Sequence, residues 1–175
     1  PHLVSLGAWS VVPVVVCSRE AGCHDLRWQQ GKRLGIGPEE SGVRSLALQL
    51  LAVNATVMPP TELLPETGSR ANDLLVQGKL DAVFIVGPPE SPLVEKMMAE
   101  PGIRLLSVDR AEAYVRRFPA LAKLTLPQGV YDFVSNVPPH NVTLISPTAN
   151  LLARDSLHPA LAYLLMRAAR EIHGG

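Results

Sequence analysis

The fold is decided by one stretch, GKRLGIGPEESGVR, which occupies residues 31–44. Residues 32–37 are KRLGIG, which contains Leu34 and Ile36 and leads into Gly-Pro, and this pattern predicts a short strand. The two glutamates and Ser41 that follow are typical of a helix start, because a serine hydroxyl caps free amides and acidic side chains suit the positive end of a helix. Apolar residues at helical spacing then predict a helix over residues 43–53.

On both sides of this strand and helix, the sequence predicts further strands, and after them strands and helices alternate. Further strands are predicted at residues 11–16, 81–87, 103–108 and 141–145, and further helices at residues 69–77, 91–99, 111–118 and 157–173. Alternation of this kind, with loops of ordinary length, is typical of a parallel sheet covered by helices. The sequence therefore predicts the α/β fold class, with a largely parallel sheet and helices on both faces.

The composition supports a folded core and argues against a polyanionic partner. Apolar residues make up 47% of the 175 residues, which is enough for one large lobe or domain. Lys and Arg number 16, as do Asp and Glu, so no global field favours nucleic acid. Both ends are expected to lie inside a longer protein, because residue 1 is Pro and the C-terminal glycines directly follow a helical pattern.

The two cysteines leave alternatives open. Cys17 and Cys23 are close enough in sequence to close a small disulfide loop in an oxidising compartment, and two free thiols fit the sequence equally well. A metal site that adds His24 is a weaker alternative, because a structural metal site normally uses a second pair of ligands. We therefore predict no metal site and no cofactor.

The predicted helix start is the candidate binding site. Free amides at Ser41, Gly42 and Val43 are placed to hold a carboxylate or phosphate oxygen, and Arg44 adds a fork of donors. The alternative is that Ser41 only caps the helix and Arg44 is a surface charge. Glu40 and its neighbour also weaken an anion site, because they already supply negative charge at this helix end.

Sequence signatures of catalysis are missing from the chain. No Walker loop, dinucleotide fingerprint or Gly-x-Ser-x-Gly elbow is present, and the five histidines are scattered. No pair of carboxylates stands out as an acid–base couple. The sequence therefore predicts a protein that is not an enzyme.

A family resemblance covers nearly the whole chain. Residues 31–44 resemble the segment that opens the second lobe of TAXI-type solute receptors of TRAP transporters, in which the pattern GKR-hydrophobic-x-hydrophobic-G-x-x-GSGT occurs. The resemblance extends through QGKLDAVF (77–84), YVRRFP (114–119), LPQGVY (126–131) and LISPTANLL (144–152). It implies one lobe of a periplasmic-binding-protein-like fold plus hinge segments.

The resemblance also implies a function and a division of the chain. Such a receptor is extracytoplasmic, clamps a small organic ligand that bears a carboxylate, and feeds a TRAP-type transporter. Its partners are the solute and a membrane permease, or a membrane anchor in the parent protein. Residues 1–30 become a hinge-crossing strand and loop, residues 31–140 the second ligand-binding lobe, and residues 141–175 a return strand and a helix that packs on the first lobe.

Family contacts carry over to Ser41, Gly42, Val43 and Arg44, and the cleft positions at strand ends become Trp9 and Gly87. Two residues depart from the pattern: Glu40 replaces the first glycine of the family motif, and Val43 replaces its threonine. Both replacements remove features that favour an anion. The alternative function is a ligand-sensing domain of a signalling or regulatory protein. Exposed apolar surface on the isolated chain favours a homodimer.

Overall fold

The computed structural model describes residues 2–20 and 25–173, without the side chains of residues 8–11, 149, 170 and 172–173. In chain order the elements are β1 (Leu3–Val11), β2 (Val14–Ser18), a 3-10 turn η1 (Leu26–Gln29), β3 (Arg33–Gly35), α1 (Gly42–Val53), β4 (Glu62–Leu64), α2 (Gly68–Val76), β5 (Ala82–Val86), α3 (Pro92–Ala99), β6 (Arg104–Leu105), α4 (Ala111–Arg117), β7 (Leu121–Leu126), β8 (Val142–Arg154) and α5 (Pro159–His173).

The strands form a mixed sheet of order β1-β8-β2-β5-β3-β4, and β6 pairs with β2 while β7 pairs with β8. The α/β class is confirmed, but the prediction of a largely parallel sheet is wrong. Within the described residues, parallel pairing joins only β3 to β4 and β3 to β5, and the other pairings are antiparallel.

The antiparallel pairing of β5, β6 and β8 with β2 follows from the position of β2. Helical crossovers make β3, β4 and β5 run in one direction, which the alternating sequence predicts for β3 and β5. β2 enters between β5 and β8 in the opposite direction, so each strand that pairs with it is antiparallel to it.

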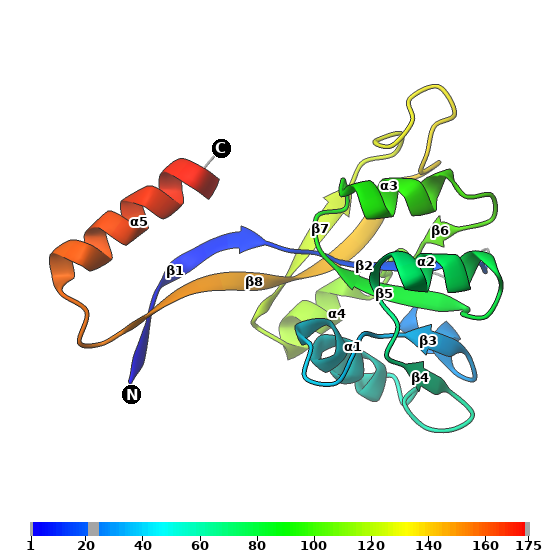
Figure 1. Cartoon of the computed structure of the whole chain (residues 1–175), viewed down its shortest axis with the longest axis horizontal. Coiled ribbons are helices and arrows are strands. Elements are labelled where there is room, and N and C mark those ends of the chain that lie inside the picture. Colours follow the sequence, from blue (N-terminus) through cyan, green and yellow to red (C-terminus); the bar gives the residue numbers. More distant parts are fainter. Residues whose placement is uncertain (1, 21–24, 174–175) are drawn as a thin grey trace.

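Helices cover both faces of the sheet, as predicted (Figure 1). Side chains of β2 alternate between two cores, because successive residues of a strand point to opposite faces. Val14 and Val16 pack with residues of α1 and α4. Val15 and Cys17 pack with residues of α2 and α3 on the other face. The β2 strand is therefore buried on both sides.

Two strands leave this body as an arm. β1 pairs antiparallel with the outer half of β8, from Leu3 opposite Arg154 to Val11 opposite Thr148, and α5 lies at the far end of the arm (Figure 1). The predicted strand over residues 11–16 is in fact two strands that meet at residues 12–13. β8 also continues well beyond the predicted 141–145, and β1, β4 and β7 were not predicted as strands.

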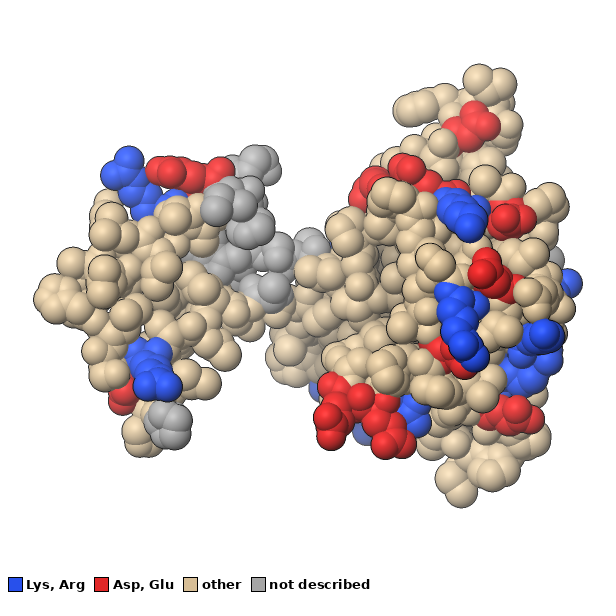
Figure 2. Space-filling model, viewed as in Figure 1, with Lys and Arg blue, Asp and Glu red and all other residues tan. Residues whose placement is uncertain are grey.

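The arm joins the body next to two prolines, Pro13 and Pro147. The Val12 amide donates to the Pro147 carbonyl at 3.4 Å, and the Gly87 amide donates to the Pro13 carbonyl at 3.1 Å. In space-filling view the molecule is a larger body and a smaller mass around α5, and acidic and basic side chains are mixed across this face of the body (Figure 2). None of the described helices has the length and apolar character that a membrane crossing requires.

Candidate functional site

The predicted helix start is the beginning of α1. Ser41 is its N-cap: the hydroxyl oxygen accepts a hydrogen bond from the Arg44 amide at 3.2 Å, and the hydroxyl donates to the Pro38 carbonyl at 2.7 Å. Gly37 permits the turn because its φ is 83°. The amides of Gly42 and Val43 donate to no group within the described part of the chain. The structure thus shows the capping role of Ser41 and also leaves two amides open.

Neither Arg44 nor Glu40 adds a ligand-binding group to this helix start. The Arg44 guanidinium donates to the Gly37 carbonyl at 3.1 Å, so it closes the turn between β3 and α1. Glu40 is exposed and has a φ of 67°, in the left-handed region that glycine adopts most easily. This geometry is consistent with a glycine at the same place in the motif that the sequence resembles.

A hollow of about 510 Å³ opens beside Gly42. It lies between α1, the carboxyl end of β5 and the connection from α4 to β7, and these residues line it: Gly42, Ser45, Leu46, Gln49, Val86, Arg117, Phe118, Pro119, Ala120, Leu121 and Pro147. A side chain at Gly42 would meet no other atom within 4 Å, so this part of the wall is backbone. The carboxyl edge of a sheet, where helices begin, is the usual place of ligand sites in open α/β folds.

The lining of this hollow is mainly apolar, with three polar side chains. Ser45 and Gln49 follow Gly42 at intervals of helical spacing, so one face of α1 provides them. Arg117 comes from the end of α4 and is the one charged residue among the described residues of this wall. None of these three residues was predicted from the sequence. Helical spacing from Gly42 was a signal for Ser45 and Gln49, whereas no local pattern links Arg117 to the site.

The remaining predicted site residues lie around the hollow. Val43 is partly buried and packs against the core beneath α1, and it is not among the residues that line the hollow. Gly87 directly follows Val86 of the wall, and a side chain at Gly87 would meet no atom within 4 Å. The backbone of Trp9 belongs to β1, and its side chain lies outside the described residues.

A network of hydrogen bonds and an ion pair holds α4 against α1. Arg110 donates to both carboxylate oxygens of buried Asp25 at 3.0 Å and to the side-chain oxygen of Asn54 at 2.6 Å. Asn54 in turn donates to the Tyr114 hydroxyl at 2.6 Å. Burial alone raises the pKa of Asp25, but the Arg27 amide and the Arg110 guanidinium outweigh it, so the pKa of this carboxyl lies below its ordinary value.

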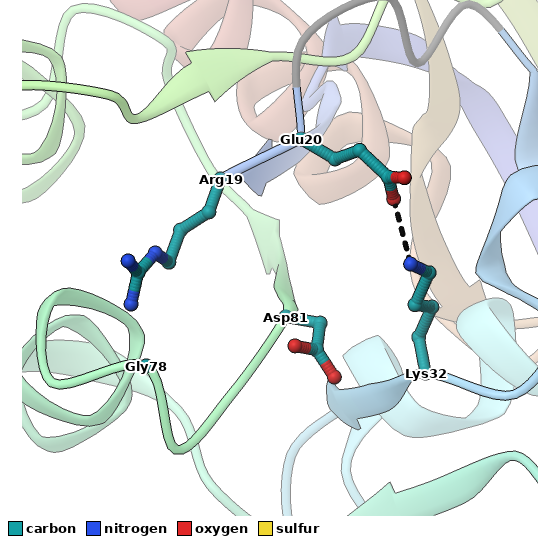
Figure 3. Close-up of a pocket in the computed structure, with 5 residues that line it drawn as sticks. All are labelled: Arg19, Glu20, Lys32, Gly78 and Asp81. Carbon is teal, nitrogen blue, oxygen red and sulfur yellow. Dashed lines mark ion pairs between the residues drawn. The ribbon is translucent and has the colours of Figure 1, made fainter.

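A polar hollow of about 390 Å³ lies at the opposite edge of the sheet (Figure 3). Its charged groups serve the fold: Lys32 pairs with Glu20 at 2.9 Å, and Arg19 donates to the Leu75 carbonyl at the end of α2 at 3.3 Å. Asp81 accepts from the amide and guanidinium of Arg33, whose hydrogen bonds lower the pKa of Asp81.

A larger hollow of about 710 Å³ lies between β6 and residues 137–142, where β8 begins. It is therefore at the same edge as the polar hollow and away from Pro13 and Pro147. We take the hollow beside Gly42 as the candidate site because it combines the carboxyl edge of β5 with open backbone and an unengaged cation.

The cysteine alternatives stay untested, since Cys23 and His24 lie outside the described residues. Cys17 is buried in the core, and burial raises the pKa of its thiol to about 12. Among the described residues no group of His, Cys, Asp or Glu side chains is arranged to hold a metal ion.

Several solved structures with a similar chain path are binding proteins from bacteria. The periplasmic aliphatic sulphonate binding protein SsuA from Escherichia coli is 13% identical with a TM-score of 0.48, over 98% of this chain and 43% of that one. The amino acid ABC transporter substrate-binding protein AbpA from Streptococcus pneumoniae, solved with L-arginine, is 10% identical with a TM-score of 0.49, over 97% and 55%. An arginine-specific periplasmic binding protein from Salmonella typhimurium is 14% identical with a TM-score of 0.48, over 99% and 60%.

The chain thus spans about half the length of the solved structures it resembles. The comparison with curated proteins finds no match. A family profile, in contrast, matches residues 5–172, which is nearly the whole chain. The chain belongs to the NMT1-like family.

Proposed function

We propose that this chain is the second ligand-binding lobe, with hinge segments, of a two-lobed extracytoplasmic solute receptor. The observation that carries the proposal is the place of the hollow beside Gly42. It lies at the carboxyl edge of β5 and includes Pro147, where β8 leaves the body for the arm. In a two-lobed receptor the ligand lies between the lobes, next to the strands that act as the hinge.

The division of the chain follows from this proposal. Residues 1–30 carry the strand that crosses the hinge, residues 31–140 form the lobe, and residues 141–175 return to the first lobe of the parent protein and pack on it. β1 and the outer half of β8 are then the hinge strands.

The proposed role is binding without catalysis. Among the described residues that line the hollow there is one cation, one serine and one glutamine, and no carboxylate or histidine to act as a base. We propose that the ligand is a small organic molecule with a carboxylate, and that the parent protein hands it to a TRAP-type permease in the membrane, as the resemblance to TAXI-type receptors implies. A membrane anchor in the parent protein belongs to the same proposal.

The test is ligand binding by the full-length parent protein. A panel of organic acids, amino acids and their neutral amides is screened by thermal unfolding, since a ligand that binds the folded state raises Tm. Gly42→Val should then raise the Kd of each hit by about tenfold or more, because the new side chain fills the hollow without meeting another protein atom.

Ser69→Val is the matched control. Ser69 is an exposed residue in the first turn of α2 and does not line the hollow, so this variant should bind as the wild type does. A panel that leaves Tm unchanged throughout, or hits with the same Kd in the Gly42→Val protein, would overturn the proposed site. If the parent protein binds a ligand but its host cells do not take that ligand up, the result would favour the sensing role.

A further inference from the structure

We infer that Arg117 recognises the carboxylate of the ligand and that the substrate class is small apolar monocarboxylates. The inference rests on the proposed function and names the substrate class of the same hollow. It starts from the place of Arg117, which is the last residue of α4 and lines the hollow opposite the Gly42 face of α1.

Arg117 differs from the other arginines near the site in being uncommitted. Arg44 donates to the Gly37 carbonyl, and Arg110 is held by Asp25 and Asn54. The exposed Arg117 side chain makes no hydrogen bond or ion pair with any described residue. Its guanidinium is therefore available to a ligand.

The surroundings of Arg117 suit a single carboxylate. A guanidinium presents donors in a planar fork that matches the two oxygens of a carboxylate. Leu46, Val86, Phe118 and Leu121 form apolar walls on the same hollow, and low polarity strengthens a charge-assisted hydrogen bond.

The same lining limits the rest of the ligand. On the wall that this lobe supplies, one cation neutralises one carboxylate, so a second ionised group would find no partner on this wall. Ser45 and Gln49 supply neutral hydrogen-bonding groups along α1. The best fit is therefore an apolar or aromatic body with one carboxylate and at most a neutral polar substituent.

The fold holds the backbone of Arg117 in a defined place. The beginning of α4 is fixed by the bonds from Arg110 to Asp25 and Asn54, and Tyr114 in its middle is buried. The amide of Phe118, which caps the end of α4, donates to the Tyr114 carbonyl at 2.8 Å. Because α4 is held at both ends, the Cα atom of Arg117 has a defined position, and specific recognition requires side chains that start from such rigid positions.

Arg116 provides a matched control. It is also exposed and also lies in the last turn of α4, so both arginines lie at the negative end of the helix, and Arg116 in addition helps to lower the pKa of Glu112. Arg116 lines only the neighbouring hollow, with Asn54 and Tyr114, whereas Arg117 lines both hollows. Substitution of each by Ala should therefore change the stability similarly and ligand binding differently.

The experiment uses the full-length parent protein and two probes of the same shape, phenylacetate and phenylacetamide. Kd is measured by ligand-detected NMR titration for the wild type, Arg117→Ala, Arg117→Lys and Arg116→Ala. In the wild type and in Arg116→Ala, the Kd of phenylacetate should be about tenfold lower than that of phenylacetamide, because one charge-assisted hydrogen bond contributes about this much. Arg117→Ala should lose this preference, and Arg117→Lys should keep part of it.

The outcomes separate this inference from the proposed function. Equal binding of both probes to the wild type, or an unchanged preference in Arg117→Ala, would overturn the role of Arg117 and leave a receptor with another ligand class. Failure of both probes to bind, together with failure of the whole panel described above, would overturn the receptor itself.

Discussion

At the scale of single residues, Asp25 links the turn η1 to α4 and α1. Its side chain accepts the Arg27 amide at 3.0 Å and the Arg110 guanidinium, and these partners hold the pKa of Asp25 below its ordinary value despite burial. The unfolded chain therefore binds a proton at this group before the folded chain does. The stabilisation is fully present above the ordinary aspartate pKa of about 4 and is lost as pH falls below it.

Asp25→Asn keeps an oxygen acceptor for the cap and removes the titrating charge. We expect the variant to be less stable at pH 7 by about 1–2 kcal/mol and to lose less stability between pH 7 and pH 3 than the wild type. Urea unfolding at several pH values measures both effects. Asp73→Asn, at an exposed position of α2, is the control and should follow the wild-type profile. Parallel profiles for wild type and Asp25→Asn would contradict the expectation.

How far the sequence predicts the site depends on where each residue lies in the chain. Ser41 and Gly42 were predicted because the cap and the open backbone belong to one local motif. Arg117 was not, because its place in the wall depends on how α4 packs against α1, through buried Tyr114 and the Arg110 contacts. The role of Arg44 was also beyond local patterns, since its bond to the Gly37 carbonyl depends on the actual turn.

At the scale of elements, the connection from β3 to α1 depends on Gly37. Its φ is 83°, and a side chain there would lie 2.5 Å from the Val43 side chain and 2.9 Å from the Ser41 hydroxyl. Gly37→Ala should therefore cost about 2–4 kcal/mol, from left-handed strain and displaced neighbours, and should weaken ligand binding in the parent protein. Denaturant unfolding and the binding assay measure the two effects.

Gly102→Ala is the control that separates the cost of left-handed backbone strain from the cost of the close contacts at Gly37. Gly102 has a φ of 85° and open space around it, so this variant should cost only the left-handed strain of about 1–2 kcal/mol. Equal losses in the two variants would show that the neighbours of Gly37 adjust without cost.

Elements with strong local patterns were predicted well, and elements defined by tertiary pairing were not. α1, α2, α3 and α4 begin and end within one residue of prediction, because caps and apolar spacing mark them. β8 was predicted to end at residue 145, whereas it continues to Arg154, with Pro147 inside it. Pro147 is tolerated inside the strand because its carbonyl, not an amide, makes the bond to Val12 where the arm joins the body.

At the scale of the whole molecule, the arm presents apolar side chains that the body does not cover. Leu161 and Leu164 of α5 are 52% and 55% exposed. We expect the 175-residue chain to self-associate through this face, and Leu161→Glu with Leu164→Glu to raise the dimer Kd at least about tenfold. Sedimentation velocity measures the change. Val134→Glu, at a 97% exposed residue of the body, should leave self-association intact, and equal loss in both proteins would contradict the role of α5.

The whole-molecule arrangement shows why the predicted sheet was wrong in its pairing. Alternating strands and helices correctly gave one common direction for β3 and β5, and β4, which was not predicted, runs the same way. The sequence held no sign that β2 lies between β5 and β8, since that position is set by the path of the chain through the arm.

The meeting of the arm and the body at Pro13 and Pro147 has a mechanical consequence. Proline has no amide hydrogen, so neither residue adds a donor to the ladder at this point. The incoming and outgoing strands are joined there by the Val12 amide and the Pro147 carbonyl, at a distance that is long for such a bond. If the arm turned against the body, the change would therefore concentrate at this weak hydrogen bond, and the paired strands on either side would move with little internal change.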